Sequence, residues 1–304
     1  MATTATNLLR DSTALVTGGG GFIGTHLCRQ LAAAGARVNV VSRGGANAGG
    51  GGGAIAGAHR VDLADAAAVD VLVHDVRPDY VFHLASHVSA SRELSAVGPT
   101  FASNLASTVN LLTSVTQVGC RRFVLAGSLE EPIAGDAPSS PYAASKAAAA
   151  MYAQMFHALY AAPIVTARIF MVYGPGQRDT RKLVPYVTRS LLAGESPQVS
   201  SGVRPVDWVY VGDVAEALVG CATTPGLEGT TIDVGTGRLT TVRSVVERLS
   251  AIIGTRQPVF GAVDDRPLEQ VRAADPRDVA ALLGRAPVDL EHGLRQTVAW
   301  YRGQ

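Results

Sequence analysis

Apolar and polar positions follow one another along the chain in the rhythm of strands and helices. Ala14 to Thr17 is a short apolar run typical of a strand buried on both faces, and Phe22 to Leu31 carries apolar residues at helical spacing. A second apolar run follows from Arg37 to Val41. This order predicts a strand, a helix and a second strand, which is the arrangement of a βαβ unit.

The same rhythm continues through the first half of the chain. Apolar runs predict further strands, and amphipathic stretches predict helices, one of which has Pro141 at its first position. We expect strands near 58–61, 80–84 and 122–126 and helices over 66–76, 99–118 and 141–160. Strands that alternate with helices are typical of an α/β fold with a doubly wound parallel sheet.

From Tyr173 onward, Gly and Pro punctuate the chain more often. A strand near 231–234 is expected to return to the main sheet. We expect helices over 183–193, 213–222, 242–253 and 288–302. We therefore divide the chain into a first domain at 1–172 and a smaller α/β domain, mainly at 173–304.

Composition limits the class of protein and its partners. Apolar residues make up 47% of the 304 residues, and 26 basic residues against 25 acidic ones give a net charge of +1. No field of one sign therefore draws the chain to nucleic acid or to a membrane surface, and we expect neither partner. Residues 1–10 lack the apolar core of a signal peptide, and no apolar run is long enough to span a bilayer. Cys28, Cys120 and Cys221 have no metal-ligand spacing and suit a reducing compartment, so we expect a cytoplasmic protein without a metal site.

The turn between the first strand and the first helix is rich in glycine. Gly18, Gly21 and Gly24 are spaced three and three, with Phe22 and Ile23 between the last two. Glycines permit a tight turn and let the backbone approach a pyrophosphate, whose charge then lies at the positive end of the helix. A run of glycines also suits a flexible turn, but the order of strand, turn and helix favours a dinucleotide site.

The end of the second strand indicates which dinucleotide is bound. An acidic residue there binds the ribose hydroxyls of NAD, whereas an Arg pairs with the 2′-phosphate of NADP. This chain has Ser42 followed by Arg43, so we favour NADP(H) over NAD(H). The alternative is a solvated loop Arg, because the flexible glycine-rich segment 44–57 follows.

Asp62 directly follows the third expected strand. Ligands bind at this edge of parallel sheets, so Asp62 is a candidate hydrogen-bond partner of the adenine. It is equally a candidate cap of the next helix, the role expected of Asp275 and Asp278 farther along the chain.

His83 and His87 are expected to be packing or loop histidines rather than metal ligands, because no ligand partner lies at metal spacing.

Candidate proton-transfer chemistry lies between the fifth expected strand and the helix after it. Ser128 follows the strand, and Tyr142 and Lys146 are four positions apart, so they project from one face of the helix. A cationic Lys beside a phenol stabilises the phenolate, and we expect it to lower the pKa of Tyr142 toward neutrality. Tyr and Lys at this spacing are often merely structural, but here they follow a dinucleotide site.

Motifs over nearly the whole chain carry a family resemblance. They are TGGGGFIG at 17–24, FHLAS at 82–86, Asn104, Ser128, YAASK at 142–146, RIFMVYGPG at 168–176, DWVYVGDV at 207–214 and Arg266 with Pro267. The chain resembles the extended short-chain dehydrogenases/reductases, in their nucleotide-sugar epimerase, dehydratase and 4-ketoreductase group. The resemblance implies a Rossmann-type domain, a smaller substrate-binding domain, a nucleotide diphosphate sugar as substrate, and a homodimer joined through helices 99–118 and 141–160.

The resemblance also assigns roles to residues. Tyr142 would transfer the proton, Lys146 would bind the cofactor ribose and tune the pKa of Tyr142, and Ser128 would bind the sugar oxygen. Further cofactor contacts are expected from Leu63, Leu84, Ala85 and Ser86. Substrate contacts are expected from His87, Met171, Arg204 and Arg266, of which Met171 stands where the family has an Asn. The two arginines lie in expected loops and suit a diphosphate, with more support from the resemblance for Arg266, and the alternative for each is an exposed loop Arg.

The shared step moves a hydride between a nicotinamide and a sugar carbon, usually carbon 4. Glu130 occupies the position of a catalytic Glu in dehydratases, whereas Leu129 replaces the Asp that protonates the leaving hydroxyl there. The segment 127–131, Gly-Ser-Leu-Glu-Glu, matches some reductases, so together with Arg43 it favours an NDP-4-keto-6-deoxyhexose reductase. The alternatives are an NDP-sugar 4-epimerase and a 4,6-dehydratase that uses Glu130, or a solvated loop pair of Glu130 and Glu131.

One alternative belongs to another class. Some proteins of this fold have lost catalysis and act as NADP-binding sensors. Loss of Tyr142 or Lys146 would indicate such a sensor, and the chain keeps both.

The segment from Ser128 to Tyr142 spans only fourteen positions and lacks the family's usual Tyr-Gly, so we expect a shorter loop over the sugar.

Overall fold

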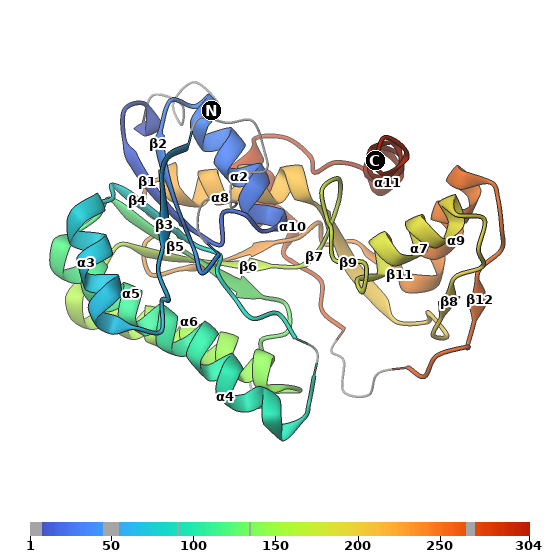
Figure 1. Ribbon diagram of the computed structural model, residues 1–304, viewed down its shortest axis with the longest axis horizontal. Helices are drawn as coiled ribbons and strands as arrows, with labels where there is room; N and C mark the ends of the chain where they lie inside the picture. The colour runs from blue at the N-terminus through green and yellow to red at the C-terminus, as the bar shows by residue number, and fades with distance from the viewer. Residues whose placement is uncertain (1–7, 45–54, 90, 134, 266–270) are drawn as a thin grey trace. The chain divides into compact units, whose positions relative to one another are not determined.

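The computed structural model describes residues 8–44, 55–89, 91–133, 135–265 and 271–304 (Figure 1). The chain divides into two compact units. The first comprises Met1–Ile169 and Ala215–Ile232, and the second comprises Phe170–Val214 and Asp233–Gln304. The chain therefore leaves the first unit, enters the second, and returns before it ends in the second.

A seven-stranded sheet forms the centre of the first unit, in the order β10-β6-β5-β4-β1-β2-β3 (Figure 1). Its strands are β1 (Thr13–Thr17), β2 (Arg37–Ser42), β3 (Ile55–Arg60), β4 (Tyr80–His83), β5 (Arg122–Ser128), β6 (Ile164–Ile169) and β10 (Thr231–Val234). All neighbouring strands from β3 to β6 pair in parallel. Every residue of β5 is buried, as expected of a central strand covered on both faces. The predicted doubly wound α/β fold is confirmed.

Helices cover both faces of this sheet. Figure 1 shows α3, α5 and α6 over one face and α2 over the other. Their bounds are α2 (Phe22–Ala33), α3 (Ala66–Val76), α5 (Ser107–Val118) and α6 (Pro141–Tyr160), and α8 (Val211–Thr223) follows later in the chain. The strand order reverses at β1, which lies between β2 and β4. In open parallel sheets, ligands bind beyond the carboxyl ends of the strands at such a reversal.

Side chains at the helix starts explain where these helices begin. Asp65 accepts hydrogen bonds from the backbone N–H groups of Ala67 and Ala68 and so caps α3. Ser140 caps α6 through the N–H group of Ala143, with Pro141 in the first turn. The predicted start of the helix at Pro141 is therefore confirmed.

The helix predicted over 99–118 is not uniform. The chain forms the short turn η2 (Leu94–Ala96), then α4 (Val97–Thr100), then the π-helical segment η3 (Phe101–Ala106), and only then α5. A π-helical turn has the same apolar face as an α-helix over a few residues, so apolar spacing alone does not reveal it. It carries Asn104, whose side chain is buried.

The second unit contains two small sheets and several helices. Strands β7 (Met171–Tyr173) and β9 (Pro205–Tyr210) pair in parallel, and β11 (Leu239–Thr241) pairs with β9 in the antiparallel sense. The short strands β8 (Gln198–Val199) and β12 (Val259–Phe260) form the other sheet. The helices are α7 (Leu183–Leu192), α9 (Val242–Ile253), α10 (Pro276–Leu283) and α11 (Leu290–Arg302).

Buried carboxylates tie the loops of the second unit together. Asp207 accepts hydrogen bonds from the backbone N–H groups of Thr236, Gly237 and Ala274, at 2.8 to 3.0 Å. Asp275 caps α10, as predicted. Asp278 does not act as a cap, because its carboxylate accepts the backbone N–H group of Asp233 instead.

Candidate active site

The glycine turn joins β1 to α2. Gly18 has a φ of 70°, a conformation that favours glycine, and a Cβ atom there would lie 2.9 Å from the backbone N of Ala85. A Cβ atom on Gly24 would lie 2.3 Å from the carbonyl O of Gly18. These two glycines therefore let the turn, the helix start and the segment after β4 approach one another.

The start of α2 suits a phosphate. Gly21 precedes the helix, and no side chain of the described residues caps it. The first N–H groups of α2, from Phe22, Ile23 and Gly24, therefore lie at the positive end of the helix without a competing side-chain acceptor. The predicted dinucleotide turn thus has the geometry that a pyrophosphate requires.

Two arginines lie where β2 and β3 end. Ser42 is half-buried, whereas Arg43 and Arg60 are exposed. Ser42 and Arg60 are partners in the strand register, and the Arg60 Nε donates a hydrogen bond to the Arg43 carbonyl O at 3.2 Å. Two positively charged side chains therefore lie at the ends of neighbouring strands.

Asp62 does not cap α3, because Asp65 does so. The exposed Asp62 instead accepts the backbone N–H group of Ala64 at 3.1 Å, within its own loop. Leu63 is buried, and its carbonyl O accepts a hydrogen bond from the Asn110 Nδ2 at 3.0 Å. This contact ties the loop after β3 to α5.

His83 is a packing residue, as predicted. It is buried between two hydroxyl groups, with its Nδ1 2.7 Å from the Thr17 Oγ1 and its Nε2 3.0 Å from the Thr108 Oγ1. Burial, together with the charge of Lys146, lowers the pKa of His83 to about 3. The imidazole is therefore neutral in the folded protein at neutral pH.

Asn104 of η3 holds the segment that follows β4. Its Oδ1 accepts hydrogen bonds from the Ser86 Oγ at 3.2 Å and from the His87 backbone N at 2.6 Å. The Ala85 backbone N donates to the Thr17 Oγ1 at 3.1 Å. Leu84, Ala85 and Ser86 thus lie at the end of β4 next to the glycine turn, and the side chain of His87 is exposed.

The structure brings Ser128, Tyr142 and Lys146 together at the carboxyl end of β5. All three side chains are buried. A hydrogen bond joins Tyr142 to Ser128, and the Lys146 Nζ lies 5.9 Å from the centroid of the Tyr142 ring. The same ammonium group donates to the carbonyl O of Ala126 in β5 at 2.8 Å.

A second polar contact fixes α6 against η3. The Asn104 Nδ2 donates to the Ser145 Oγ at 3.0 Å, and the Ser145 Oγ donates to the carbonyl O of Tyr142 at 2.8 Å. Ser145 was not a predicted site residue. Its position between Tyr142 and Lys146 in the motif of 142–146 was the signal for it.

Burial shifts the pKa values of Tyr142 and Lys146 in opposite directions. It raises the pKa of Tyr142 to about 12, although the hydrogen bond with Ser128 counteracts this shift. It lowers the pKa of Lys146 to about 8, and the negative charge of Glu131 counteracts that shift. The expected lowering of the Tyr142 pKa is therefore wrong for this arrangement, because loss of hydration and the negative charges of Glu130 and Glu131 outweigh the hydrogen bond with Ser128.

The tight turn after β5 gives three neighbouring residues different exposures and contacts. Leu129 is buried, with 9% of its surface exposed. Glu130 is partly exposed, and its backbone N donates to the Ser128 Oγ at 3.2 Å. Glu131 is only 4% exposed and contacts Arg168 of β6, so the alternative of a solvated pair is wrong for Glu131.

Two of the candidate substrate residues belong to the second unit. Met171 lies in β7 and packs against the core around Tyr173. Arg204 is half-buried just before β9, and its carbonyl O accepts the backbone N–H group of Val242. Arg266 lies outside the described residues.

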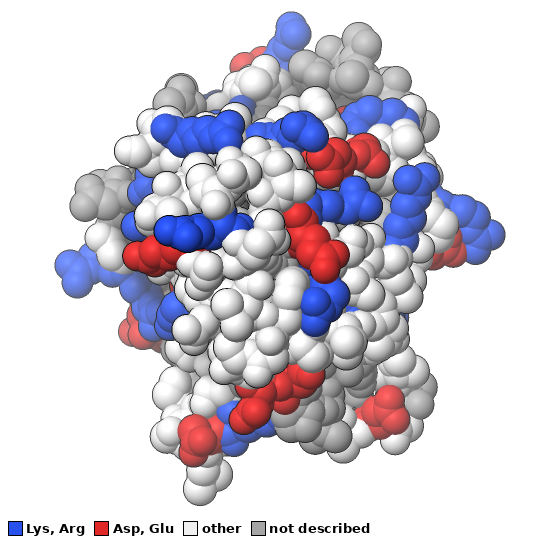
Figure 2. Space-filling model, turned by 90° about the vertical axis from the view of Figure 1, so that its right-hand side faces the viewer, with Lys and Arg blue, Asp and Glu red and all other residues white. Residues whose placement is uncertain are grey.

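Surface charge, metal ligands and helix hydrophobicity give no further candidate site among the described residues. Figure 2 shows basic and acidic side chains intermixed on one face of the molecule, in keeping with the net charge of +1. Among the described residues, no group of three or more His, Cys, Asp or Glu could hold a metal ion. In the same part of the chain, every helix is too short or too polar to cross a bilayer. The cytoplasmic location stays a prediction.

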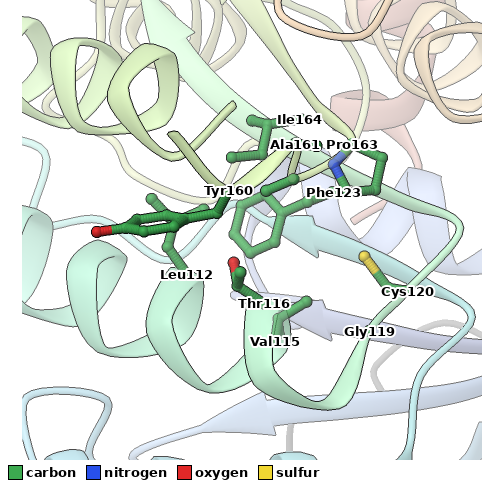
Figure 3. Close-up of a pocket in the computed structure, with 11 residues that line it drawn as sticks. Leu112, Val115, Thr116, Gly119, Cys120, Phe123, Tyr160, Ala161, Pro163 and Ile164 are labelled. Atoms are coloured by element: carbon green, nitrogen blue, oxygen red, sulfur yellow. The ribbon is translucent and has the colours of Figure 1, made fainter. Parts of the chain in front are cut away.

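A pocket of about 200 Å³ lies at the amino ends of β5 and β6, the opposite end of these strands from Ser128. Figure 3 shows Phe123 and Ile164 from the starts of β5 and β6, with Leu112 and Val115 of α5 and Tyr160 of α6 around them. Ligands of parallel sheets bind at the carboxyl ends of the strands. We therefore do not assign this pocket to the active site.

Comparisons with known proteins agree with the motifs and the fold. A family model described as the NAD dependent epimerase/dehydratase family matches residues 14–235. The chain is 31% identical over 313 residues to a dTDP-glucose 4,6-dehydratase from Actinoplanes sp. SE50/110, an alignment that covers 95% of this chain and 97% of the relative.

Two solved structures resemble the chain over almost its whole length. The UDP-glucose 4-epimerase from Thermotoga maritima with UDP-glucose has a TM-score of 0.84 at 27% identity and covers 96% of this chain and 99% of its own. The UDP-glucose 4-epimerase from Thermus thermophilus in complex with NAD has a TM-score of 0.82 at 31% identity, with the same coverage of 96% and 99%. The chain therefore belongs to the NAD dependent epimerase/dehydratase family and is an NAD(P)-dependent enzyme of the nucleotide-sugar epimerase and 4,6-dehydratase group.

Proposed function

We propose that the protein is a nucleotide-sugar 4-epimerase. A single observation carries this choice within the family: Leu129 is apolar and buried at the position where dehydratases resembling this chain have an acidic Asp. Interconversion at carbon 4 needs no acid for a leaving hydroxyl. It needs only the cluster of Ser128, Tyr142 and Lys146 beside the dinucleotide turn.

We further propose that the first unit binds the dinucleotide and that the second contributes binding of the nucleotide sugar. The glycine turn fits the dinucleotide because a Cβ at Gly18 or Gly24 would meet backbone atoms, and because the N–H groups at the start of α2 suit a pyrophosphate. When bound, an oxidised nicotinamide supplies a reversible hydride acceptor and a positive charge. The substrate contacts of His87, Met171 and Arg204 remain part of this proposal.

The proton-transfer role belongs to Tyr142. Its raised pKa keeps the phenol protonated at neutral pH in the protein alone, so a phenolate requires further positive charge in the site. Lys146 is positively charged below about pH 8, and an oxidised nicotinamide, when bound, would supply the further charge. Ser128, which shares a hydrogen bond with Tyr142, would bind the oxygen on carbon 4 of the sugar.

A 4,6-dehydratase is the second candidate. Glu130 favours it, because this carboxylate lies in the turn after Ser128 and its charge acts on Tyr142. The 4-ketoreductase that the segment 127–131 suggested has less support. Its second Glu, Glu131, is engaged with Arg168, and the relatives and structures described above are named dehydratases and epimerases.

The test is to incubate the purified protein with UDP-glucose and, separately, with dTDP-glucose, and to identify the products by proton NMR. The 4-epimer, formed without net change in nicotinamide absorbance, supports the proposal. A 4-keto-6-deoxy product contradicts it in favour of a dehydratase that uses Glu130. A third incubation contains an NDP-4-keto-6-deoxy sugar and NADPH. Steady consumption of NADPH there, without epimer formation in the first two, contradicts the proposal in favour of a reductase.

We also propose that the cofactor is NADP(H) rather than NAD(H). The exposed guanidinium groups of Arg43 and Arg60 lie at the ends of neighbouring strands, and Ser42 leaves the end of β2 without a carboxylate. These charges suit a 2′-phosphate. The relative from Thermus thermophilus was solved with NAD, so a direct comparison of the two cofactors decides the point.

We finally propose a homodimer built on α4, η3 and α6. Large apolar side chains are exposed on these elements: Val97 at 46%, Phe101 at 56%, Met151 at 69% and Tyr152 at 41%. Apolar side chains clustered on adjoining helices are typical of an association surface. Sedimentation of the purified protein tests this proposal.

A further inference from the structure

Glu131 is a buried carboxylate, and each of its two oxygens has a partner. Its Oε1 accepts the backbone N–H group of Ser128 at 2.7 Å, and its Oε2 lies 3.2 Å from the Arg168 Nε. The Arg168 side chain is itself only 20% exposed. A carboxylate is tolerated in such a place only when it is both hydrogen-bonded and paired with a positive charge.

The local backbone is shaped around this carboxylate. The Glu131 backbone N donates to the carbonyl O of Ser128 at 3.1 Å, which closes a tight turn. A Cβ atom on Gly127 would lie 2.6 Å from the Glu131 Oε1, so any larger residue there would displace the Glu131 carboxylate. Gly127 is also the register partner of Arg168 across β5 and β6. The side chain of Glu131 thus folds back over the end of β5.

The negative charge of this carboxylate also affects the pKa of Lys146. The Lys146 ammonium is anchored at the carbonyl O of Ala126, two residues before Ser128. Burial favours its neutral form, and the charge of Glu131 favours its charged form. The other titratable or charged groups that act in this region come from β4, the turn after β5, β6 and α6; they are His83, Glu130, Arg168 and Tyr142.

We propose that Glu131 is a positioning residue of the active site: with Arg168 it fixes the turn that carries Ser128, and its negative charge stabilises the Lys146 ammonium. The kinetic part of this inference rests on the proposed function, whereas the electrostatic part does not. Glu131 touches neither substrate nor cofactor in this scheme and acts through Ser128 and Lys146.

The chain offers a matched control for a merely structural role. Arg122, at the start of β5, is buried and pairs with Glu228. This pair lies at the opposite end of the same strand from Ser128. Glu131→Gln and Glu228→Gln therefore make the same chemical change to a carboxylate paired with an Arg, and only Glu131→Gln touches the site.

The first measurement needs neither substrate nor turnover. Lys146 and Lys182 are the two lysines of the chain, so protein labelled with ¹³C-lysine gives two side-chain signals to titrate by NMR. Lys182 is exposed and serves as an internal reference, and a Lys182→Arg variant assigns the signals. We expect Glu131→Gln to lower the titration midpoint of Lys146 by about one pH unit, while Glu228→Gln leaves it unchanged. An unchanged midpoint in Glu131→Gln overturns the proposal.

Glu131→Asp keeps the inference testable if Glu131→Gln folds poorly. The shorter side chain retains the charge near Lys146, and we expect the midpoint to stay close to that of the wild type. A midpoint in Glu131→Asp that falls well below the wild-type value contradicts the assignment to charge.

The second measurement is the pH dependence of kcat and KM for interconversion of UDP-glucose and its 4-epimer. We expect Glu131→Gln to lower kcat by about tenfold, the scale of one charge-assisted hydrogen bond. KM should change little, and the alkaline limb of the kcat profile should move to lower pH. A normal profile combined with a shifted NMR midpoint overturns the catalytic part. If the wild type converts no nucleotide sugar, the proposed function fails, and the NMR result still decides the role of Glu131.

Discussion

Tyr142 and Lys146 share one buried environment, and burial acts on both in favour of their neutral forms. The phenol therefore keeps its proton well above neutral pH, and the ammonium loses its proton near pH 8. Charges that enter or surround the cluster decide whether proton transfer occurs. At the scale of single residues, the chemistry of the site thus depends on electrostatic neighbours as much as on the groups themselves.

Replacement of Tyr142 by Phe should separate binding from chemistry. We expect cofactor affinity to stay near the wild-type value, whereas turnover should fall by at least about a hundredfold, because the proton-transfer group is lost. Cofactor titration and product formation measure the two effects. Turnover at a rate similar to that of the wild type would show that another group transfers the proton.

His83 predicts a dependence of stability on pH. Its pKa is lowered from 6.5 to about 3 in the folded protein, so between these values the unfolded chain binds more protons. The free energy of unfolding should therefore fall as the pH drops from about 6.5 toward 3. Urea unfolding at pH 7 and pH 5 measures the slope, and His83→Asn should show a shallower one.

His74→Asn is the control for this experiment. His74 is an exposed residue of α3, so its variant makes the same chemical change outside the buried site of His83. If His83→Asn and the wild type lost stability equally between pH 7 and pH 5, His83 would not be the residue that couples folding to protons.

At the scale of elements, the strand ends and helix starts place the functional groups. The spacing of apolar positions predicted α3 and α9 with their observed bounds. The spacing of Tyr142 and Lys146, with Ser128 after a strand, predicted the cluster at the end of β5. The burial of Glu131 was not predictable in the same way, because it depends on Arg168, 37 positions away, and on the space that Gly127 leaves.

Gly24 tests the turn between β1 and α2. A methyl group there would meet the carbonyl O of Gly18 at 2.3 Å, so Gly24→Ala should displace the turn, lower stability by about 1–3 kcal/mol and weaken cofactor binding. Gly98→Ala is the matched control, because nothing lies within 4 Å of a Cβ there. Equal stability and cofactor affinity in both variants would contradict the close packing of the turn.

Arg43 tests cofactor choice at the end of β2. We expect Arg43→Ala to weaken NADP⁺ binding by about tenfold, because a charged partner of the 2′-phosphate is lost, and to leave NAD⁺ binding nearly unchanged. Fluorescence titration with each dinucleotide measures both affinities. Arg37→Ala, at the opposite end of the same strand, controls for the loss of one charge. Equal losses for both dinucleotides would withdraw the preference for NADP(H).

At the scale of the whole molecule, the proposed association of two copies explains why α4, η3 and α6 expose large apolar side chains. Met151→Glu places a charge in the proposed interface and should shift the protein from dimer to monomer, as sedimentation velocity would measure. Val71→Glu on α3 is the control, since Val71 is comparably exposed, at 61% against 69% for Met151. A wild-type protein that sediments as a monomer would contradict the proposal.

The late return of β10 to the main sheet affects how the chain folds during synthesis and where it can be truncated. During synthesis, β6 emerges from the ribosome long before its outer neighbour β10. Until β10 is made, β6 is therefore an edge strand without a partner on one side. Most of β6 is apolar and buried in the finished protein, and an open edge of this kind invites aggregation. A clone truncated after residue 172 would end in that condition, so a fragment for cofactor studies needs residues 215–234, which include β10, joined to its end.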